Sequence, residues 1–359
     1  MKCVIIIPTL NPDQKIIRLV QDLKKENFNM IVIVNDGSKK EYDTIFTQLE
    51  IFGCKVTHHK INQGKGQAIK TGINFADKNY KDFIGYITVD GDYQHLPKDV
   101  KKVALKMEAD DTKIVLGERS FKDKNVPFKS RIGNGFSTLF FRLQTGVYVE
   151  DTQTGLRGIP CRYREFAMQV EGSRYEYEMN FLRDAASNKI KFEMVRIETV
   201  YENNNEGTHF RPLKDAYLIY KEPIKFTLIA VMSSVIDIGL FTILHKLFSS
   251  ILLAIVNLNI ISAMSNVIAR ITSGIFNFLM NKKVAFKSEG NIKKQAIQYI
   301  SLFLVQMCIS TILITLATNL PINITVAKII IDVAIFCVNY FIEKRFIFNI
   351  NKTNVKYEK

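Results

Sequence analysis

The chain has 359 residues, of which 47% are hydrophobic and 23% charged, and its formal net charge is +14. This composition excludes a wholly disordered chain and a collagen-like chain. From Pro223 to the end there are 14 Lys and Arg against 5 Asp and Glu. Because these basic residues flank long apolar stretches, they favour a membrane-embedded C-terminal half over a nucleic-acid-binding surface, and we expect no nucleic acid partner.

Residues 1–222 alternate short β-rich runs with longer amphipathic stretches. The expected strands are Cys3–Ile7, Met30–Val34, Lys55–His58, Phe83–Val89, Lys113–Leu116 and Lys191–Ile197. The expected helices lie near residues 14–25, 65–78, 97–108 and 175–187. This order is typical of an α/β fold, Rossmann-like, with a mostly parallel sheet between two layers of helices. Ligands of such sheets bind beyond the carboxyl ends of the strands.

Residues 223–350 contain four apolar stretches, each long enough to cross a bilayer core, which takes about 20 residues. They are Phe226–Leu247, Leu252–Leu279, Ala296–Leu316 and Ile324–Ile342. Lys and Arg gather between the second and third stretches and after the fourth, including the basic tail 351–359. The positive-inside bias predicts an all-α, four-helix transmembrane domain in the cell membrane, with the N-terminal domain and the C-terminus in the cytoplasm. A buried helical bundle of a soluble protein is the alternative.

The ends of the second and fourth apolar stretches repeat one sequence pattern. Residues 277–286 and 339–348 both read Asn, aromatic, two apolar, polar, two basic, two apolar, Phe. Each copy closes a hairpin of two apolar stretches at the cytoplasmic edge. Two hairpins of the same orientation indicate a parallel repeat about an axis along the membrane normal. The alternative is that Lys and aromatic anchors recur at any membrane edge.

Asp90, Gly91 and Asp92 directly follow the strand Phe83–Val89. Two carboxylates at i and i+2 can hold a hard cation such as Mg²⁺ or Mn²⁺ together with a diphosphate, and Gln94 supplies a neutral oxygen nearby. A polar turn is the alternative.

Two further loops are suited to a nucleotide. Asn35 and Asp36 follow the second strand, where an amide and a carboxylate can bind a base or ribose. The segment from Asn62 places Lys65 and Gly66 at the start of a helix, where backbone N–H groups favour a phosphate. The sequence has no GxxxxGK[ST] or GxGxxG motif, so it gives no support to an ATPase or a dinucleotide-binding protein.

These motifs, in this order, resemble family 2 glycosyltransferases of the GT-A fold, and more narrowly the polyprenyl-phosphate glycosyltransferases of the dolichol-phosphate mannose synthase type. The segments concerned are 8–11, 35–38, 62–66, 90–94, 151–157 and 208–215. The C-terminal half resembles the GtrA-like four-span domain at Asp237, Asn277, Asn281 and Asn339. Together the two resemblances cover nearly the whole chain.

The resemblance implies roles for individual residues. The nucleotide-sugar would be bound by Pro8, Asn11, Asn35, Asp36, Asn62, Lys65, Gly66 and Asp90; the metal by Asp90, Asp92 and Gln94; and the acceptor phosphate by Arg119 and Arg131. Asp151 matches the family's candidate catalytic carboxylate, and Asp92 is the second catalytic candidate. The sequence departs from the family's pattern at two places. The acidic residue that commonly follows the Asn of the first loop is displaced by Pro12-Asp13, and Asn35 stands where the family commonly has an Asp, which weakens the case for Asn35 in base recognition.

The chemistry itself favours a phosphate acceptor. A phosphate monoester is largely dianionic near pH 7, since its second pKa is about 6, and is already a nucleophile. Two arginines suit one phosphate and a cation suits the other. Asp151 is therefore either a base or a residue that orients Arg157 or the acceptor, and the expected displacement inverts the anomeric carbon.

The expected protein is thus a membrane-bound hexosyl- or N-acetylhexosaminyltransferase that uses a nucleotide-sugar, with UDP favoured over GDP, and undecaprenyl phosphate for cell-envelope glycans. The absence of tryptophan removes the QxxRW segment of processive synthases. The apolar stretch Ile132–Val147 either lies at the membrane surface and admits a lipid or packs on the sheet.

The charged residues Asp237, Arg270, Lys328 and Asp332 fall within spans, where charges usually have partners. The membrane domain either anchors the enzyme or also moves the lipid-linked sugar across the bilayer. Other possibilities are a transporter or scaffold that only binds nucleotide-sugar, and a transferase acting on hydroxyl groups. The sugar, the final glycan and a homo-oligomeric state stay open.

Overall fold

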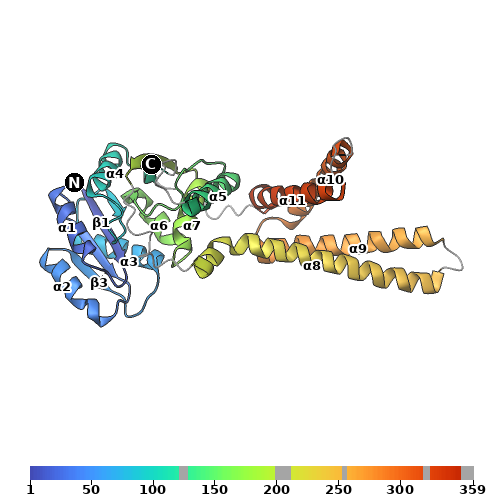
Figure 1. Cartoon of the computed structure of the whole chain (residues 1–359), viewed down its shortest axis with the longest axis horizontal. Coiled ribbons are helices and arrows are strands. Elements are labelled where there is room, and N and C mark those ends of the chain that lie inside the picture. The colour runs from blue at the N-terminus through green and yellow to red at the C-terminus, as the bar shows by residue number, and fades with distance from the viewer. Residues whose placement is uncertain (121–127, 199–211, 253–256, 318–323, 349–359) are drawn as a thin grey trace. The chain divides into compact units, whose positions relative to one another are not determined.

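The structure is a computed structural model that describes residues 1–120, 128–198, 212–252, 257–317 and 324–348. The chain divides into two compact units, Met1–Ile219 and Tyr220–Lys352 (Figure 1). Each unit is described below by itself.

The first unit is built on a seven-stranded sheet in the order β3-β2-β1-β4-β6-β5-β7. Its strands are β1 Cys3–Thr9, β2 Ile31–Asn35, β3 Lys55–His58, β4 Gly85–Thr88, β5 Lys113–Arg119, β6 Arg157–Pro160 and β7 Lys191–Ile197. All neighbouring pairs are parallel except those of β6, which runs antiparallel to both β4 and β5. The predicted mostly parallel sheet is confirmed.

Helices cover both faces of this sheet, as predicted. They are α1 Lys15–Lys25, α2 Asp43–Ile51, α3 Lys65–Asn79, α4 Pro97–Ala109, α5 Phe128–Thr145, α6 Arg164–Gln169 and α7 Glu176–Ser187, with short 3₁₀ turns at Lys40–Tyr42 and Cys161–Tyr163. In β1, Ile5 and Ile7 face the core under α1, α2 and α4, whereas Val4 and Ile6 face the core under α3, α6 and α7. This alternation explains why β1 is apolar along its whole length.

The register of the sheet aligns the functional loops. β1 pairs with β2 up to Thr9 opposite Asn35, and with β4 up to Ile6 opposite Thr88. The polar segments that follow β1, β2 and β4 therefore leave the sheet at one edge, where ligands of such sheets bind.

The strand β6 was not predicted from the sequence. It has four residues and contains Gly158 and Pro160, so it shows neither a long apolar run nor alternation. Its place is set by its neighbours: a Cβ on Gly158 would lie 3.0 Å from Val103 Cγ1, so α4 packs closely over this strand. Tertiary packing thus decides the conformation of this segment.

The second unit contains four described helices, which lie over the four predicted apolar stretches. They are α8 Pro212–Leu252, which belongs to this unit from Tyr220 on, α9 Leu258–Met280, α10 Ile292–Ala317 and α11 Ile324–Ile342. Within the described residues, the segment Lys221–Ile251 of α8 is the one helical stretch long and apolar enough to cross a membrane by length and composition. Five-residue π-helical turns, η4 Asn281–Ala285 and η5 Glu343–Ile347, extend α9 and α11.

Gly72 tests the close approach of α3 to β1. A Cβ at this position would lie 2.4 Å from Ile6 Cγ2, whereas a Cβ on Gly133 of α5 would meet nothing within 4 Å. We expect Gly72→Ala to destabilise the first unit by about 1–3 kcal/mol through overpacking, and Gly133→Ala to be neutral or to stabilise it by up to about 1 kcal/mol.

The buried thiols of Cys3 and Cys54 allow this unit to be followed in the full chain in detergent. Thiol labelling of these two cysteines during heating, located by mass spectrometry, should begin at a lower temperature in Gly72→Ala, by about 2–4 °C per kcal/mol for a unit of this size. Equal labelling midpoints in the two variants would contradict the packing described here.

Candidate active site

Asn11 and Asn35 join the loops that follow β1 and β2. The backbone N–H of Asn11 donates to Ser38 Oγ at 2.8 Å, and Asn11 Oδ1 accepts from the Lys39 N–H at 3.1 Å. Asn35 Oδ1 accepts from the Ser38 N–H at 2.8 Å, and its amide nitrogen lies 3.0 Å from His58 Nδ1. Both side chains therefore hold the loops in place, and Pro8 lies within β1 just before them.

Asp36 braces the next loop. Its two carboxylate oxygens accept from the backbone N–H groups of Gln63 and Gly64, each at 2.8 Å, and His59 Nδ1 lies 2.7 Å from Oδ1. The side chain is almost fully buried. Asp36 therefore shapes the segment 62–66, whatever it also contacts in a ligand.

The two glycines of that segment permit close packing. Gly64 has a φ of +100°, and a Cβ on Gly66 would lie 2.4 Å from Tyr177 Cβ. Asn62 Oδ1 accepts from the Arg174 side chain at 3.2 Å. The start of α3 is thus pressed against the segment before α7, which brings Lys65 toward the end of β4.

Lys65 joins two carboxylates at the centre of the site. Its Nζ lies 2.7 Å from Asp90 Oδ1 and 2.9 Å from Glu178 Oε1, with 16% of the lysine side chain exposed. Burial opposes charge on Lys65, but the two carboxylates raise its pKa above the ordinary value. The lysine is therefore charged, and it neutralises the residue that was predicted to bind metal.

Burial alone would raise the pKa of Asp90, but Lys65 and His95 together lower it to about 2. The backbone N–H of Asp90 donates to His95 Nδ1 at 3.2 Å, which places the ring proton on Nε2. Burial lowers the pKa of His95 to about 4, so its ring is neutral at pH 7. Asp90 is thus an ionised carboxylate held from both sides.

Asp92 has the opposite balance. Burial, and then the charge of Asp90, raise the pKa of its carboxyl. Asp92 Oδ1 accepts from the Gln94 backbone N–H at 3.1 Å. A hard divalent cation between Asp90 and Asp92 would remove the repulsion between their carboxylates, so these two residues fit such an ion. Within the described residues, no three His, Cys, Asp or Glu side chains are grouped closely enough to form a metal site by themselves.

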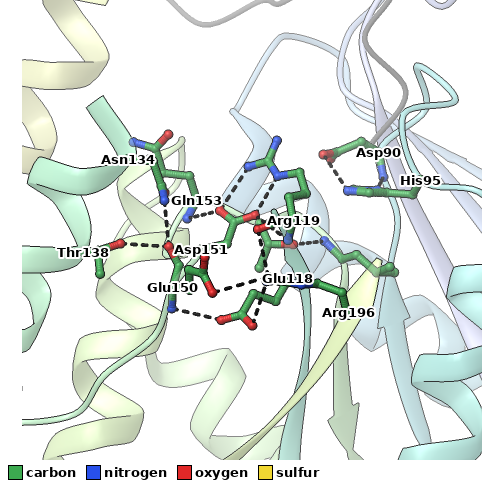
Figure 2. A network of polar contacts seen from close by, with 12 residues as sticks. Asp90, His95, Glu118, Arg119, Asn134, Thr138, Glu150, Asp151, Gln153 and Arg196 are labelled. Carbon is green, nitrogen blue, oxygen red and sulfur yellow. Dashed lines mark hydrogen bonds and ion pairs between the residues drawn. The ribbon is translucent and has the colours of Figure 1, made fainter. Parts of the chain in front are cut away.

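Arg119 and Asp151 form a two-point ion pair beside Asp90, as Figure 2 shows. Arg119 Nε donates to Asp151 Oδ2 at 2.6 Å and Nη2 donates to Oδ1 at 3.1 Å. Asp151 is fully buried and also accepts from the Gln153 N–H at 3.2 Å. Its oxygens are therefore committed to orienting Arg119.

Arg157 has different partners. Its Nε donates to the Thr154 carbonyl at 3.0 Å and Nη1 donates to the Glu178 carbonyl at 2.8 Å. Nη2 is buried and has no partner in the structure. The sequence analysis expected Asp151 to be a base or to orient Arg157 or the acceptor. In the structure its carboxylate instead accepts hydrogen bonds from Arg119, whereas Arg157 donates to the Thr154 and Glu178 carbonyls.

A second layer supports this pair from outside. Glu118 Oε1 accepts from the Glu150 N–H at 3.0 Å, and Arg196 lies 3.4 Å from Glu150 and 3.6 Å from Glu118 (Figure 2). Burial raises the pKa of Glu118 above its ordinary value. The segment that carries Asp151 is thus fixed to the end of β5.

The helix α5 is tied to the same segment. Asn134 Nδ2 and Thr138 Oγ1 both donate to the Glu150 carbonyl, at 2.7 and 2.9 Å (Figure 2). Arg131 lies one turn before Asn134 on this helix and is exposed. One face of α5 is buried in the first unit, whereas three of its large apolar side chains are about half exposed: Phe136, Leu139 and Leu143. The helix therefore has both a packed face and an open apolar face.

A sequence profile of glycosyl transferase family 2 matches residues 4–170. An uncharacterised protein of Methanocaldococcus jannaschii is 33% identical over 201 residues, which cover 55% of this chain and 81% of that protein. The UDP-N-acetylglucosamine–dolichyl-phosphate N-acetylglucosaminyltransferase of Methanococcus voltae is 32% identical over 216 residues, covering 55% of this chain and 85% of that one. The chain belongs to glycosyl transferase family 2.

Two other comparisons concern the membrane half and the fold. A profile of the GtrA/DPMS transmembrane domain matches residues 225–348, so this glycosyltransferase is a membrane protein. The mannosyl-3-phosphoglycerate synthase of Rubrobacter xylanophilus has a similar structure, with a TM-score of 0.48 and 14% identity, over 62% of this chain and 72% of that one.

Three residues that contact the predicted site residues Asp36, Asp90 and Lys65 were not predicted from the sequence. They are His59, His95 and Glu178. His95 could have been found, because it lies within the segment after β4. Glu178 could not, since it belongs to α7 and meets Lys65 through folding alone.

Two of the charged candidates of the GtrA-type domain lie close together. Arg270 Nη1 lies 3.5 Å from Asp237 Oδ2, and Ser273 Oγ donates to Asp237 Oδ1 at 3.0 Å. Asp332 lies in α11 and is exposed. The side chain of Lys328 and the residues before 212 in the closing segment lie outside the described part of the structure. Asp237 and Arg270 are thus partners within the second unit.

Gly155 provides a test of the position of Asp90. A Cβ on Gly155 would lie 2.3 Å from Asp90 Oδ2, whereas a Cβ on Gly91 would meet its neighbours at ordinary contacts of 3.4 Å or more. If Asp90 belongs to the active site as expected, Gly155→Ala should lower transferase activity by about 10²-fold, because a misplacement of about 1 Å in an active site has that effect. Gly91→Ala should retain most of the activity.

Both variants would be assayed for transfer at saturating donor, with the melting temperature as a control for folding. A more damaging effect of Gly91→Ala than of Gly155→Ala would show that Asp90 is not positioned as described.

Proposed function

We propose that this enzyme transfers one hexose or N-acetylhexosamine from a UDP-sugar to a polyprenyl phosphate at the cytoplasmic face of the cell membrane. The observation that carries the proposal is the presence of two oriented charged groups side by side. One is the Asp90 and Asp92 pair with Lys65, and the other is Arg119 held by Asp151. The two groups are close enough for the charge of Arg119 to help lower the pKa of the Asp90 carboxyl.

The first site suits the donor. A Mg²⁺ or Mn²⁺ ion held by Asp90, Asp92 and Gln94 would supply positive charge to the leaving diphosphate. Lys65 is tied to Asp90 and Glu178 and stands at the start of α3, where it can turn to a phosphate oxygen. The loops fixed by Asn11, Asn35 and Asp36 are placed to bind the nucleoside.

The second site suits the acceptor. Arg119 presents its guanidinium on a buried carboxylate, so its direction is set before a ligand arrives. Arg131, on the helix tied to the Asp151 segment, would add a second cation, and the open apolar face of α5 would receive the polyprenyl chain.

The reaction needs no proton transfer. An oxygen of the dianionic acceptor phosphate forms a bond to the anomeric carbon from the face opposite the leaving group, while the bond from that carbon to the UDP oxygen breaks. Configuration is therefore inverted, and UDP leaves with the electron pair of the broken bond. The protein's part is to hold two anions close together and to stabilise the charge that moves to UDP.

The choice of substrates has separate support. The Methanococcus voltae relative is named for UDP-N-acetylglucosamine and dolichyl phosphate. We therefore rank UDP-N-acetylglucosamine first as donor, followed by the UDP-linked forms of glucose and galactose. Undecaprenyl and dolichyl phosphates are both acceptor candidates, and a hydroxyl acceptor is disfavoured because it would not require Arg119.

The first test uses the purified full chain in detergent with Mn²⁺, a panel of UDP- and GDP-sugars, and undecaprenyl or dolichyl phosphate. Mass spectrometry should show a gain of one sugar on the lipid, removed by EDTA and restored by Mn²⁺. Asp92→Asn should lower the rate by at least about 10²-fold, since the cation site loses a charged ligand. The control Asp111→Asn changes a carboxylate that is 64% exposed and should leave the rate unchanged. Donor binding without transfer to any lipid would refute the proposal.

Asp151→Asn separates orientation from base catalysis. If Asp151 orients Arg119, the variant should raise the KM for the polyprenyl phosphate by about tenfold, the order expected for one weakened charged hydrogen bond. The rate should still fall as the pH decreases through about 6, because the acceptor phosphate then gains a proton.

The acceptor KM and the pH profile of kcat would be measured for Asp151→Asn and Arg119→Lys in parallel. Similar KM increases with an unchanged pH profile are expected for both. A large loss of kcat confined to Asp151→Asn, with loss of the acidic limb, would instead make Asp151 a base.

A further inference from the structure

The repeated pattern at residues 277–286 and 339–348 is also a structural repeat. Each copy continues its helix into a five-residue π-helical turn, which begins at Asn281 in one copy and at Glu343 in the other. The closing hydrogen bonds are equivalent: the Phe286 N–H donates to the Asn281 carbonyl at 2.9 Å, and the Phe348 N–H to the Glu343 carbonyl at 2.7 Å. The two turns are therefore copies of one local structure.

The two copies contact each other through equivalent residues. Phe286 and Phe348, the last residues of each copy, stack with ring centroids 5.3 Å apart. Phe278 meets Phe348 at 5.7 Å, and its counterpart Tyr340 meets Phe286 at 5.9 Å. Exchanging the copies thus exchanges these contacts. This is the mark of a pseudo-two-fold axis, in agreement with the parallel repeat expected from the sequence.

Asn281 and Glu343 meet where the equivalent residues face each other. Asn281 Nδ2 donates to Glu343 Oε2 at 3.1 Å, and both side chains are at most 5% exposed. Asn281 Oδ1 is buried and has no partner in the structure. A buried carboxyl and an unsatisfied amide oxygen are costly, so within a helical bundle they indicate a polar site rather than a packing contact.

A cavity of about 160 Å³ opens beside this pair within the second unit. Its polar lining comes from Asn277, Asn339, Glu343, Tyr299 and Gln306, of which Asn277 and Asn339 are equivalent in the repeat. The remaining lining residues are apolar or aromatic: Phe226, Ala230, Leu302, Phe303 and Phe336. A cavity of about 150 Å³ in another protein binds benzene, so this one is large enough for a single six-membered ring and excludes an oligosaccharide.

Hydrogen bonds fix part of this lining. Tyr299 Oη and Asn281 Nδ2 both donate to Asn277 Oδ1 at 2.9 Å, and Asn277 Nδ2 donates to Ser233 Oγ at 2.9 Å. Four helical elements, α8 to α10 and η4, are joined in this way. The polar wall of the cavity is therefore ordered before a ligand enters.

The chemistry of the lining selects the ligand class. It contains no Lys or Arg, so a phosphate would find no positive charge there. Planar amide groups can donate to and accept from neighbouring hydroxyls, a carboxyl group can accept from them, and aromatic rings offer apolar faces. An uncharged, hydroxyl-rich ring fits this combination.

We propose that this cavity of the GtrA-type domain binds the sugar ring of the lipid-linked product. This inference rests on the proposed function for the identity of that product. It assigns to the membrane domain a recognition site for the sugar, separate from the transferase site.

The absence of tryptophan from the chain makes the test direct. Phe336→Trp places a single indole in the cavity wall of the full-length protein. Its fluorescence would be titrated in detergent with synthetic polyprenyl-phosphate N-acetylglucosamine, with the glucose form and with bare polyprenyl phosphate. The same samples would be assayed for transfer, and circular dichroism would report folding.

We expect a saturable fluorescence change with the sugar-bearing lipids and none with the bare phosphate. In the Phe336→Trp background, Glu343→Gln and Gln306→Leu should each weaken this binding by at least about tenfold, the order of a lost hydrogen bond to a buried group. The transfer rate should be unchanged in both. Cys308→Ala, an exposed position on the same helix as Gln306, should behave like the parent.

Other results would overturn the inference. Equal responses to bare and sugar-bearing lipid would mean that the chain or phosphate is bound. A response to Na⁺, Ca²⁺ or pH alone would make the cavity a cation or proton site. No response, or binding unaffected by Glu343→Gln and Gln306→Leu, would exclude sugar binding there. Because the probes are supplied, failure of transfer in the parent would count against the proposed function and not against the cavity.

Discussion

The buried contact of Lys65 with Asp90 and Glu178 ties the site together. It joins the start of α3, the segment after β4 and the helix α7, and its two ends, Lys65 and Glu178, are more than a hundred positions apart in the sequence. Removing a lysine ammonium from water is costly, and two carboxylates are needed to offset that cost. The bridge therefore holds only when all three segments are in place. It also sets a condition on the donor, since a cation that binds Asp90 must take over part of the neutralisation that Lys65 now provides.

Arg119 and Asp151 solve a different problem on the other side of the site. The buried two-point ion pair fixes the direction of the Arg119 guanidinium in advance, which is what binding of the proposed acceptor phosphate would need. The ion pair with Asp151 also reduces the repulsion between Arg119 and the other cations nearby. The site thus contains positive charge in two oriented places, each balanced by carboxylates. This arrangement suits the joining of two phosphate-bearing molecules without proton transfer.

The sequence was sufficient for the features that depend on local pattern. Apolar runs marked six of the seven strands, and the carboxylates after β4 marked the site. It was insufficient wherever the partner is distant. The strand β6 lacks any pattern of its own, and Glu178 meets Lys65 only through the fold. Asp36 shows the converse: its residue type suggested a ligand, yet both its oxygens accept backbone N–H groups of its own neighbouring loop. Residue type predicts chemistry, but the structure decides which contacts use it.

The repeat in the membrane half shows why an internal symmetry can be incomplete for a physical reason. Its two copies keep the same turns and exchange aromatic contacts, but they differ at the pair that meets at 3.1 Å. Two carboxylates at that distance in a buried place would repel each other, and one would have to gain a proton. Two amides would avoid the repulsion, but the pair would then lack the carboxyl group that accepts the hydrogen bond from Asn281. One amide and one carboxyl satisfy both conditions, because the amide can donate to the acid and still keep an oxygen for another donor. The difference between Asn281 and Glu343 is therefore what a polar site on a pseudo-two-fold axis requires.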